Sequence, residues 1–189
     1  MAKRTFNTES SATSLTSAYF MQNFYRYNRN AIKTSYRKDY NQTELSYEDS
    51  RALKRAASKL SSFNYTKEEN GDNIVSTIQA FAETYNNAID SSSNKEADTY
   101  RQNRQLKALS QKYGEDLEDI GITIEEDGKL TVNENILKAS SFEDVKKVFS
   151  EESDYVKNIR TIAKRMNAQS YEEIYALMTG SGGRLNIVL

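Results

Sequence analysis

The sequence predicts a mainly α protein, in which elongated amphipathic helices pack as a bundle or as coiled-coil-like legs, with one β-hairpin near residues 121–133. Apolar residues recur at steps of three and four through most of the 189 residues, which is the spacing of one helix face. Proline is absent, so no residue of that type interrupts a long helix. One stretch after residue 120 instead alternates apolar and polar residues, as a half-buried strand does.

The composition supports extended helices. Hydrophobic residues make up 37% of the chain and charged residues 28%, a balance that favours narrow apolar seams over a thick core. We divide the chain into a basic, tyrosine-rich arm over residues 1–46, a helical domain with the hairpin over 47–179, and a flexible glycine-rich linker with an apolar tail over 180–189.

The arm interleaves aromatic residues with basic ones, as proteins that bind single-stranded nucleic acid do, because rings stack on bases and cations follow phosphates. The residues are Tyr19, Phe20, Phe24, Tyr25, Tyr27, Tyr36 and Tyr40 among Arg26, Arg29, Lys33, Arg37 and Lys38. Two other structures remain open: a helical face through Leu15, Tyr19, Ile32 and Tyr36, or an arm that is disordered until it meets a protein partner. We favour the arm that becomes ordered on a partner.

The first helix of the domain is predicted to start at Ser46, because an acidic residue, Asp49, follows it at the capping-box position. Its apolar stripe is Leu53, Ala56, Ala57, Leu60 and Phe63, and its other faces carry Arg51, Lys54, Arg55 and Lys59. Such a basic helix binds anionic membranes or calmodulin-like grooves in some proteins, and packs on an acidic neighbour in others.

The charge distribution favours the acidic neighbour. Residues 1–66 contain 11 Lys and Arg against 5 Asp and Glu, a net charge of +6. Residues 67–189 contain 15 against 22, a net charge of -7, so the two parts of the chain attract each other.

The strongest predicted helix runs from Ile74 to Ile89, after a polar loop over 64–73 that ends in a cap at Asp72 or Asn73. Its apolar residues are spaced four, three, four and three apart, the pattern of a coiled-coil seam, and they are Ile74, Ile78, Phe81, Tyr85 and Ala88. Two heptads of this pattern suffice for helix pairing, and we predict Ile78, Phe81 and Tyr85 as protein-contact residues.

After a polar break over 90–94, the next helix is predicted from Ala97 to Tyr113, with Gly114 as its C-cap and a short helix from 115 to 120 behind it. The hairpin follows, with alternating apolar residues on both sides of Asp127-Gly128. That dipeptide suits a tight turn with a positive φ.

Three helix starts are predicted beyond the hairpin. Asn133 or Glu134 begins a short helix, and Ser141 caps a helix over 142–149. A further helix opens at 153 or 154, and Ser170 with Glu173 opens a separate last helix that carries Ile174, Leu177 and Met178.

The last residues form an apolar, strand-prone tail, in which Leu185, Ile187 and Val188 are predicted protein-contact residues. The tail either adds as a strand to another chain or folds back over the core of its own chain.

The composition argues against catalysis. The chain has neither Cys nor His, which removes the thiol nucleophile, the commonest general base and the usual ligands of structural zinc. The acids at 125–127 lack the spacing of a calcium loop, and Gly180 to Gly183 lack the lysine of a phosphate-binding loop. We predict no catalytic, cofactor-binding or metal-binding residues and no enzyme activity; an enzyme of carboxylate chemistry would need two paired acids in a cleft.

No run of about 18 apolar residues is present, so no membrane span is expected. The first residues also lack the cationic and apolar segments of a general secretory signal peptide.

Residues 73–90, followed by residues 119–140, resemble the C-terminal conserved region of the bacterial flagellar filament cap protein, also called hook-associated protein 2. The matching segments are Tyr85-Asn86, Gly121-Ile122-Thr123, Asp127-Gly128-Lys129-Leu130 and Val145-Lys146-Lys147-Val148-Phe149. The likeness covers about residues 73–166. It does not extend to residues 1–72, and the β-rich head domains of the family have no counterpart in this sequence.

The resemblance implies helical legs that dock on a filament end. It implies a shortened relative of the cap, with flagellin or other flagellar axial proteins as partners and with self-association. Its implied location is the flagellum, reached by flagellar export, with the cytoplasm as the alternative. Single-stranded nucleic-acid binding by the arm is the alternative function.

Overall fold

The structure is a computed structural model, and it describes residues 17–65 and 71–181. Residues 17–24 are helical. The further elements are η1 (Arg29–Ile32), α2 (Thr34–Arg37), α3 (Gln42–Ser61), α4 (Gly71–Ser91), α5 (Tyr100–Lys112), α6 (Gly114–Asp119), β1 (Ile122–Ile124), β2 (Leu130–Val132), α7 (Glu134–Ala139), α8 (Phe142–Phe149) and α9 (Asp154–Ser181). The mainly α class with one β-hairpin is thereby confirmed for the described residues.

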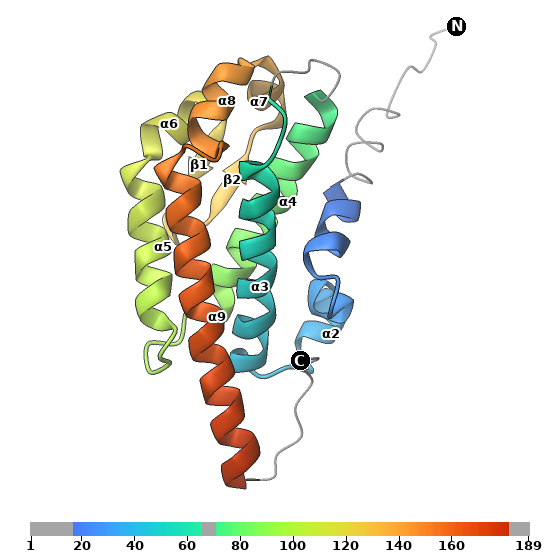
Figure 1. Cartoon of the computed structure of the whole chain (residues 1–189), viewed down its shortest axis with the longest axis vertical. Helices are drawn as coiled ribbons and strands as arrows, with labels where there is room; N and C mark the ends of the chain where they lie inside the picture. Colours follow the sequence, from blue (N-terminus) through green and yellow to red (C-terminus); the bar gives the residue numbers. More distant parts are fainter. Residues whose placement is uncertain (1–16, 66–70, 182–189) are drawn as a thin grey trace, which may run out of the picture.

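The four long helices α3, α4, α5 and α9 run along the long axis of the molecule (Figure 1). Opposite ends of α3 and α9 meet, because the hydroxyls of Ser46 and Ser170 form a hydrogen bond at 3.0 Å and Arg160 donates to Ser61 Oγ at 3.5 Å. Gln42, at the start of α3, donates to the carbonyl oxygen of residue 90, near the end of α4. Both neighbours of α3 are therefore antiparallel to it.

Helix α5 completes an up-down-up-down bundle. Asn103 Nδ2 donates to the carbonyl oxygen of Ile89 at 2.7 Å, and Ser110 Oγ donates to the hydroxyl of Tyr85 at 3.0 Å, so α5 is antiparallel to α4. The same Ser110 hydroxyl lies 3.1 Å from that of Tyr155 on α9. One serine thus joins three helices, and burial raises the pKa of both tyrosines.

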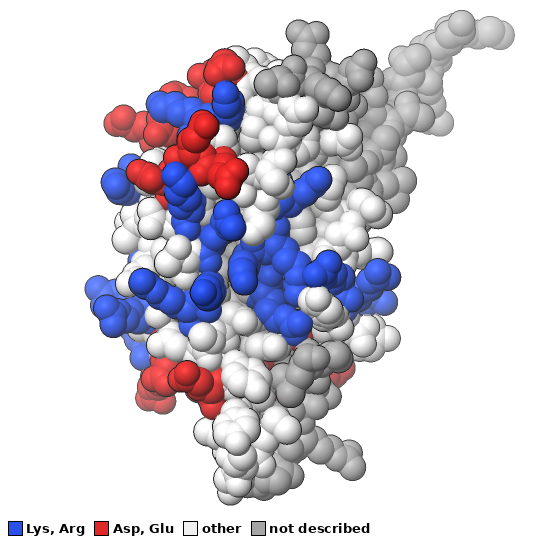
Figure 2. Space-filling view, in the orientation of Figure 1, with Lys and Arg blue, Asp and Glu red and all other residues white. Residues whose placement is uncertain are grey.

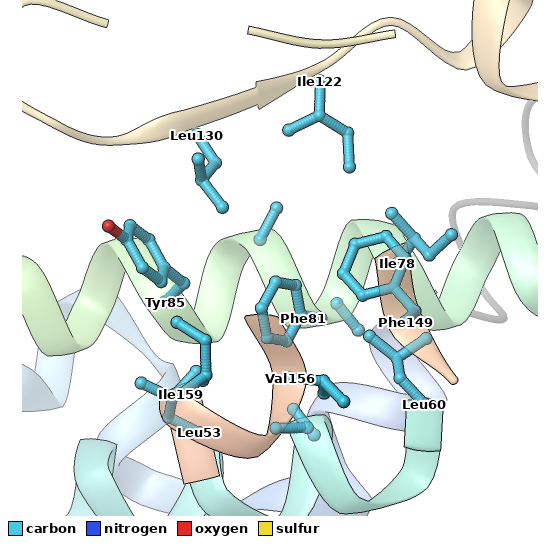
Figure 3. Close-up of a cluster of buried hydrophobic side chains, with 14 of the residues drawn as sticks. Leu53, Leu60, Ile78, Phe81, Tyr85, Ile122, Leu130, Phe149, Val156 and Ile159 are labelled. Carbon is cyan, nitrogen blue, oxygen red and sulfur yellow. The ribbon is translucent and has the colours of Figure 1, made fainter. Parts of the chain in front are cut away.

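The hairpin lies against α4, and β2 contacts the second half of this helix. Strands β1 and β2 are antiparallel, with Ile122 opposite Val132 and Ile124 opposite Leu130. Ile122 and Leu130 point from the hairpin toward α4 and are buried, whereas the threonines between the apolar positions are exposed (Figure 3). The two-residue alternation therefore assigns one face of the hairpin to the core.

The hairpin turn has the positive φ predicted for Asp127-Gly128, with Gly128 at +83°. Gly128 N–H donates to the carbonyl oxygen of Glu125, and Glu125 N–H donates to that of Lys129, each at 2.8 Å. The loop closed by this pair has three residues with glycine in the left-handed position, which is a common hairpin geometry.

Helix α3 starts at Gln42, and the predicted start at Ser46 is wrong. Asn41 Oδ1 accepts from the backbone N–H of Glu44, and Glu44 Oε2 accepts from the backbone N–H of Asn41, which makes a complete capping box. Asn caps a helix as well as Ser does, and the glutamate three residues after Asn41 reinforces the earlier cap. Ser46 is buried inside the helix.

Helix α9 is continuous, and the separate helix predicted to open at Ser170 does not exist. Ser170 Oγ donates to the carbonyl oxygen of Met166, one turn earlier, so its hydroxyl is used within the helix and not as a cap. The helix also includes Gly180 and Ser181, where the linker was predicted to begin. The caps predicted at Asn133 before α7 and at Ser141 before α8 are confirmed. The cap predicted at Asp72 or Asn73 is wrong because α4 already begins at Gly71, and the C-cap predicted at Gly114 is wrong because this glycine is the first residue of α6.

The described part of the N-terminal arm packs on the chain itself. Met21, Phe24, Tyr25 and Ala31 are buried in the same core cluster as the apolar stripe of α3. Residues 17–40 and α3 therefore belong to one folded body, and α3 begins inside the range assigned to the arm.

A buried carboxylate, Asp49, fastens this segment to α3. Its oxygens accept from the Tyr25 hydroxyl at 2.7 Å and from two nitrogens of Arg37 at 2.9 and 2.8 Å. Arg37 also donates to the carbonyl oxygen of Ala31, and Asn87 on α4 donates to the Tyr25 hydroxyl. Burial and the Asp49 charge raise the pKa of Tyr25, which keeps its hydroxyl protonated as a donor.

Two glycines with positive φ give a matched test of the hairpin. Gly121 has a φ of +80°, and an added Cβ would lie 2.7 Å from Ile136 Cβ and 3.0 Å from the carbonyl oxygen of Asn133. At Gly128 the three atoms nearest to an added Cβ all belong to the flexible side chain of Lys107. We expect Gly121→Ala to lower the free energy of unfolding by about 3 kcal/mol and Gly128→Ala by about 1 kcal/mol, because both carry left-handed strain but only the first meets atoms held in place.

Urea denaturation of both variants measures this difference. If both variants lost the same free energy of unfolding, α7 would have moved away from the added methyl group of residue 121 without an energetic cost.

Candidate contact surfaces

The predicted contact residues of the coiled-coil seam lie inside the molecule. Ile78, Phe81 and Tyr85 are each 0% exposed and pack among side chains from several elements (Figure 3). The ring of Phe81 meets that of Phe149 edge-on at 5.5 Å between centroids. The seam therefore pairs α4 with other elements of its own chain, and these three residues are not displayed to a partner. Periodicity shows that a face is buried, but not which chain covers it.

A side chain of the same helix, α4, binds the hairpin. Its amide makes a pair of hydrogen bonds with the backbone of β2, as a neighbouring strand would. Asn86 Nδ2 donates to the carbonyl oxygen of Leu130, and the N–H of Leu130 donates to Asn86 Oδ1, both at 2.8 Å. Lys129 Nζ lies 2.9 Å from the carboxylate of Asp90, one turn further along α4. The end of α4 and the hairpin are thus joined by paired hydrogen bonds and an exposed ion pair.

The last segment of the resemblance reaches the same core. Val145, Val148 and Phe149 of α8 are all buried. The ring of Phe149 also contacts Tyr155 of α9, with centroids 6.1 Å apart. The apolar residues of the segments that carry the resemblance therefore pack in one core.

An exposed apolar surface missed by the sequence predictions lies at the end of α9. Tyr171, Tyr175 and Met178 are 42%, 59% and 49% exposed and follow one another at steps of four and three. We call these three residues the α9-end surface. In Figure 1 this part of α9 projects beyond the other long helices.

The α9-end surface is supported by a buried residue on the same helix. Ile174 is 1% exposed, and the ring of Tyr171 packs beside that of Tyr47 on α3 at 6.2 Å. The helical spacing of the tyrosines was the available signal, but the prediction for this segment named Ile174, Leu177 and Met178 and left the tyrosines out.

The remaining predicted contact residues, Leu185, Ile187 and Val188, lie outside the described residues.

A second feature of the surface is a group of arginines around Tyr27. The guanidinium carbons of Arg26, Arg51 and Arg55 lie 4.8, 4.5 and 4.5 Å from the centroid of this ring. Arg26 also donates to the Tyr27 hydroxyl at 3.0 Å, and this hydrogen bond lowers the pKa of Tyr27. The attraction between cations and an aromatic face holds three like charges together.

These contacts differ from the acidic neighbour expected for the basic helix. Arg51 also stacks on Tyr47 and pairs with Glu48 of its own helix at 3.7 Å, and Arg55 donates to the carbonyl oxygen of Phe24. The arginines of α3 thus meet rings and oxygens from residues 1–66, the basic part of the chain.

Glu48 lies beneath these arginines with 1% of its side chain exposed. Burial raises its pKa to about 7, and the charges of Arg51 and Arg55 and a hydrogen bond with Asn28 oppose this rise. The nearby carboxylate of Asp49 adds to it.

One cavity is lined by two carboxylates, the pair that catalysis by acids would need. It has a volume of about 700 Å³ between residues 17–33, α4 and β2, and Glu83 and Glu134 both line it. Gln79 and Lys138 both bind Glu134, and the hydrogen bond from Lys138 lowers its pKa, whereas burial raises the pKa of Glu83. With its oxygens occupied by these two side chains, Glu134 is poorly suited to act on a substrate.

In the described part of the chain, no group of three or more acids is arranged to hold a metal ion. Within residues 17–65 and 71–181, no helix combines the length and the apolar character needed to cross a membrane.

Comparisons with protein families, with curated proteins and with solved structures each found no match to this chain. Its function is therefore inferred from its own surfaces and contacts.

The junction between α4 and the hairpin can be tested with Asn86→Ala. This variant leaves the N–H and carbonyl of Leu130 without their partner, so we expect the free energy of unfolding to fall by about 2 kcal/mol. Amide hydrogen exchange at Leu130 should accelerate. Lys129→Ala removes only the exposed ion pairs and should cost less than about 1 kcal/mol. Equal losses in the two variants would contradict a special role for Asn86.

The raised pKa of Glu48 predicts a pH dependence of stability. Its ordinary pKa is 4.5 and its folded value is about 7, so the folded state binds more protons between these values. The free energy of unfolding should therefore decrease as the pH rises from about 4.5 through 7. The chain has no histidine to add its own titration in this range.

Urea denaturation between pH 5 and 8 measures this decrease, and Glu48→Gln should make it smaller. Glu83, whose pKa burial also raises, contributes in the same direction in both proteins, so the difference between them isolates Glu48. Identical pH profiles would contradict the assignment.

Proposed function

We propose that this protein is a non-catalytic structural or assembly component of the bacterial flagellum, a shortened relative of the filament cap protein that acts through protein–protein contacts. The observation that carries the proposal is the direct contact between separate segments of the resemblance. Asn86, from the first segment, makes two hydrogen bonds with Leu130, from the hairpin segment. Segments that resemble a family and also bond to each other support the proposal better than short motifs spread over unrelated places.

The α9-end surface is the proposed contact. Residues at positions i, i+4 and i+7 of one helix face are the anchors that an amphipathic helix inserts into a partner groove. Tyr171, Tyr175 and Met178 have this spacing, and aromatic residues and Met are enriched at protein interfaces. Because α9 is continuous from the core to this end, the surface is held by a rigid helix.

The proposed partners are flagellin or other flagellar axial proteins, with self-association as a further outcome. The proposed place of action is the flagellum, reached by flagellar export, with the cytoplasm as the alternative.

The test is light scattering of the purified protein alone and mixed with flagellin or hook-associated proteins from the same cell. We expect a complex with one of them, and we expect Tyr175→Ala combined with Met178→Ala to weaken it by at least tenfold, since central apolar anchors commonly contribute more than about 1 kcal/mol each. Glu172→Ala is the matched control, because this exposed residue lies off the proposed face of α9.

Circular dichroism should show that both variants keep the helical fold. A protein that binds none of these partners would overturn the proposal. A complex that ignores the double variant but is lost on cutting after Gly180 would keep the function and move the contact to the tail.

A further inference from the structure

The structure separates the aromatic and basic residues of the N-terminal segment into two groups. One group is used inside the molecule: Phe24 and Tyr25 are buried, Arg37 binds Asp49, and Tyr40 donates to Asn28. The other group remains at the surface around α3, with Tyr19 at 61% and Tyr27 at 46% exposure. A nucleic-acid site on this segment must be built from the second group.

Tyr19 of this second group lines a groove between residues 19–26 and α3. The groove has a volume of about 520 Å³. The aromatic and basic residues that line it include Tyr19, Phe20, Arg26, Lys54, Arg55 and Lys59. No acidic side chain of the described residues lines it. It therefore combines exposed ring surface with positive charge along one wall of α3.

The groove opens onto a larger basic surface. On α3, Arg51, Lys54 and Arg55 share a helix face, and Arg160 of α9 reaches Ser61 at the end of α3. Figure 2 shows Lys and Arg side chains crossing the middle of this face, over α9 and α3, with the acidic side chains gathered toward the two ends. Cations crowded on one face attract an extended anion.

We propose that this groove binds single-stranded nucleic acid, with backbone phosphates along Arg26, Lys54 and Lys59 and a base stacked on Tyr19. A site for single-stranded nucleic acid differs from a basic surface in having exposed aromatic rings beside its cations. The bases stack on the rings, and the phosphates bind the cations. An acidic protein or an anionic membrane would use the charge but would have no need of the exposed ring. This function is separate from the proposed flagellar contact, which lies at the end of α9.

The experiment is fluorescence anisotropy of the full chain with a labelled 20-nucleotide oligo-dT, over a series of salt concentrations. Tyr19→Ala should weaken binding by roughly tenfold with the salt dependence unchanged, because a stacking contact is lost and no ionic one. Arg26→Gln, Lys54→Gln and Lys59→Gln together should reduce the slope of log affinity against log salt by about 2, since each phosphate contact on a single strand contributes about 0.7.

Two control variants keep the result specific. Tyr175→Ala removes an exposed tyrosine outside the groove, and Lys147→Gln removes an exposed lysine on α8. Both should bind oligo-dT as the unmodified protein does. Because Tyr19 is exposed and α3 keeps its buried stripe, circular dichroism of the groove variants should be unchanged.

Either of two results would overturn the proposal. One is the absence of oligo-dT binding at low salt. The other is equal binding of polyglutamate or phosphatidylserine vesicles with no effect of Tyr19→Ala, which would make the groove a basic surface for an acidic protein or a membrane. Neither result bears on the α9-end surface, since Tyr175→Ala with Met178→Ala tests that contact separately.

Discussion

The placement of the N-terminal segment depends on one buried carboxylate. Asp49 is 0% exposed in the middle of α3, where an unpaired charge would be strongly unfavourable. Arg37 and Tyr25 provide its partners, and Tyr25 is in turn bound by Asn87 of α4. Burial acts to lower the pKa of Arg37. The hydrogen bonds and the charge interaction with Asp49 outweigh this effect and raise the pKa. These contacts hold the segment against α3, where its residues 19–26 form the outer wall of the groove.

The two proposed surfaces differ in how the fold supports them. The α9-end surface lies on a continuous helix whose first half is packed in the bundle, so its spacing follows from helix geometry alone. The groove instead lies between two segments, and its shape depends on the Asp49 contacts that join them. A partner of the first surface meets a preformed helix face, whereas a ligand of the second meets side chains from both segments.

Rules based on neighbouring residues predicted most helices and strands of this fold. They failed where two residues of the same stretch were both suited to begin or end a helix. The hairpin, the seam helix and the caps at Asn133 and Ser141 follow from alternation, helical spacing and capping chemistry. The predicted helix starts at Ser46 and Ser170 failed because each serine, although suited to a cap, lies within a longer helix and hydrogen-bonds to the other. Their contact joins α3 to α9, 124 residues apart in the sequence, and no local pattern contains it.

The sequence by itself determined the helical class, the single hairpin with its positive φ at Gly128, and the burial of Ile78, Phe81 and Tyr85, because these depend on spacing and backbone sterics. Only the tertiary structure decided what covers each face. The seam meets its own chain, the arginines of the basic helix contact tyrosine rings, and an apolar face at the end of α9 stays exposed. The reason is physical: apolar burial and charge pairing are satisfied by any suitable neighbour, and chain topology selects which neighbour is close enough.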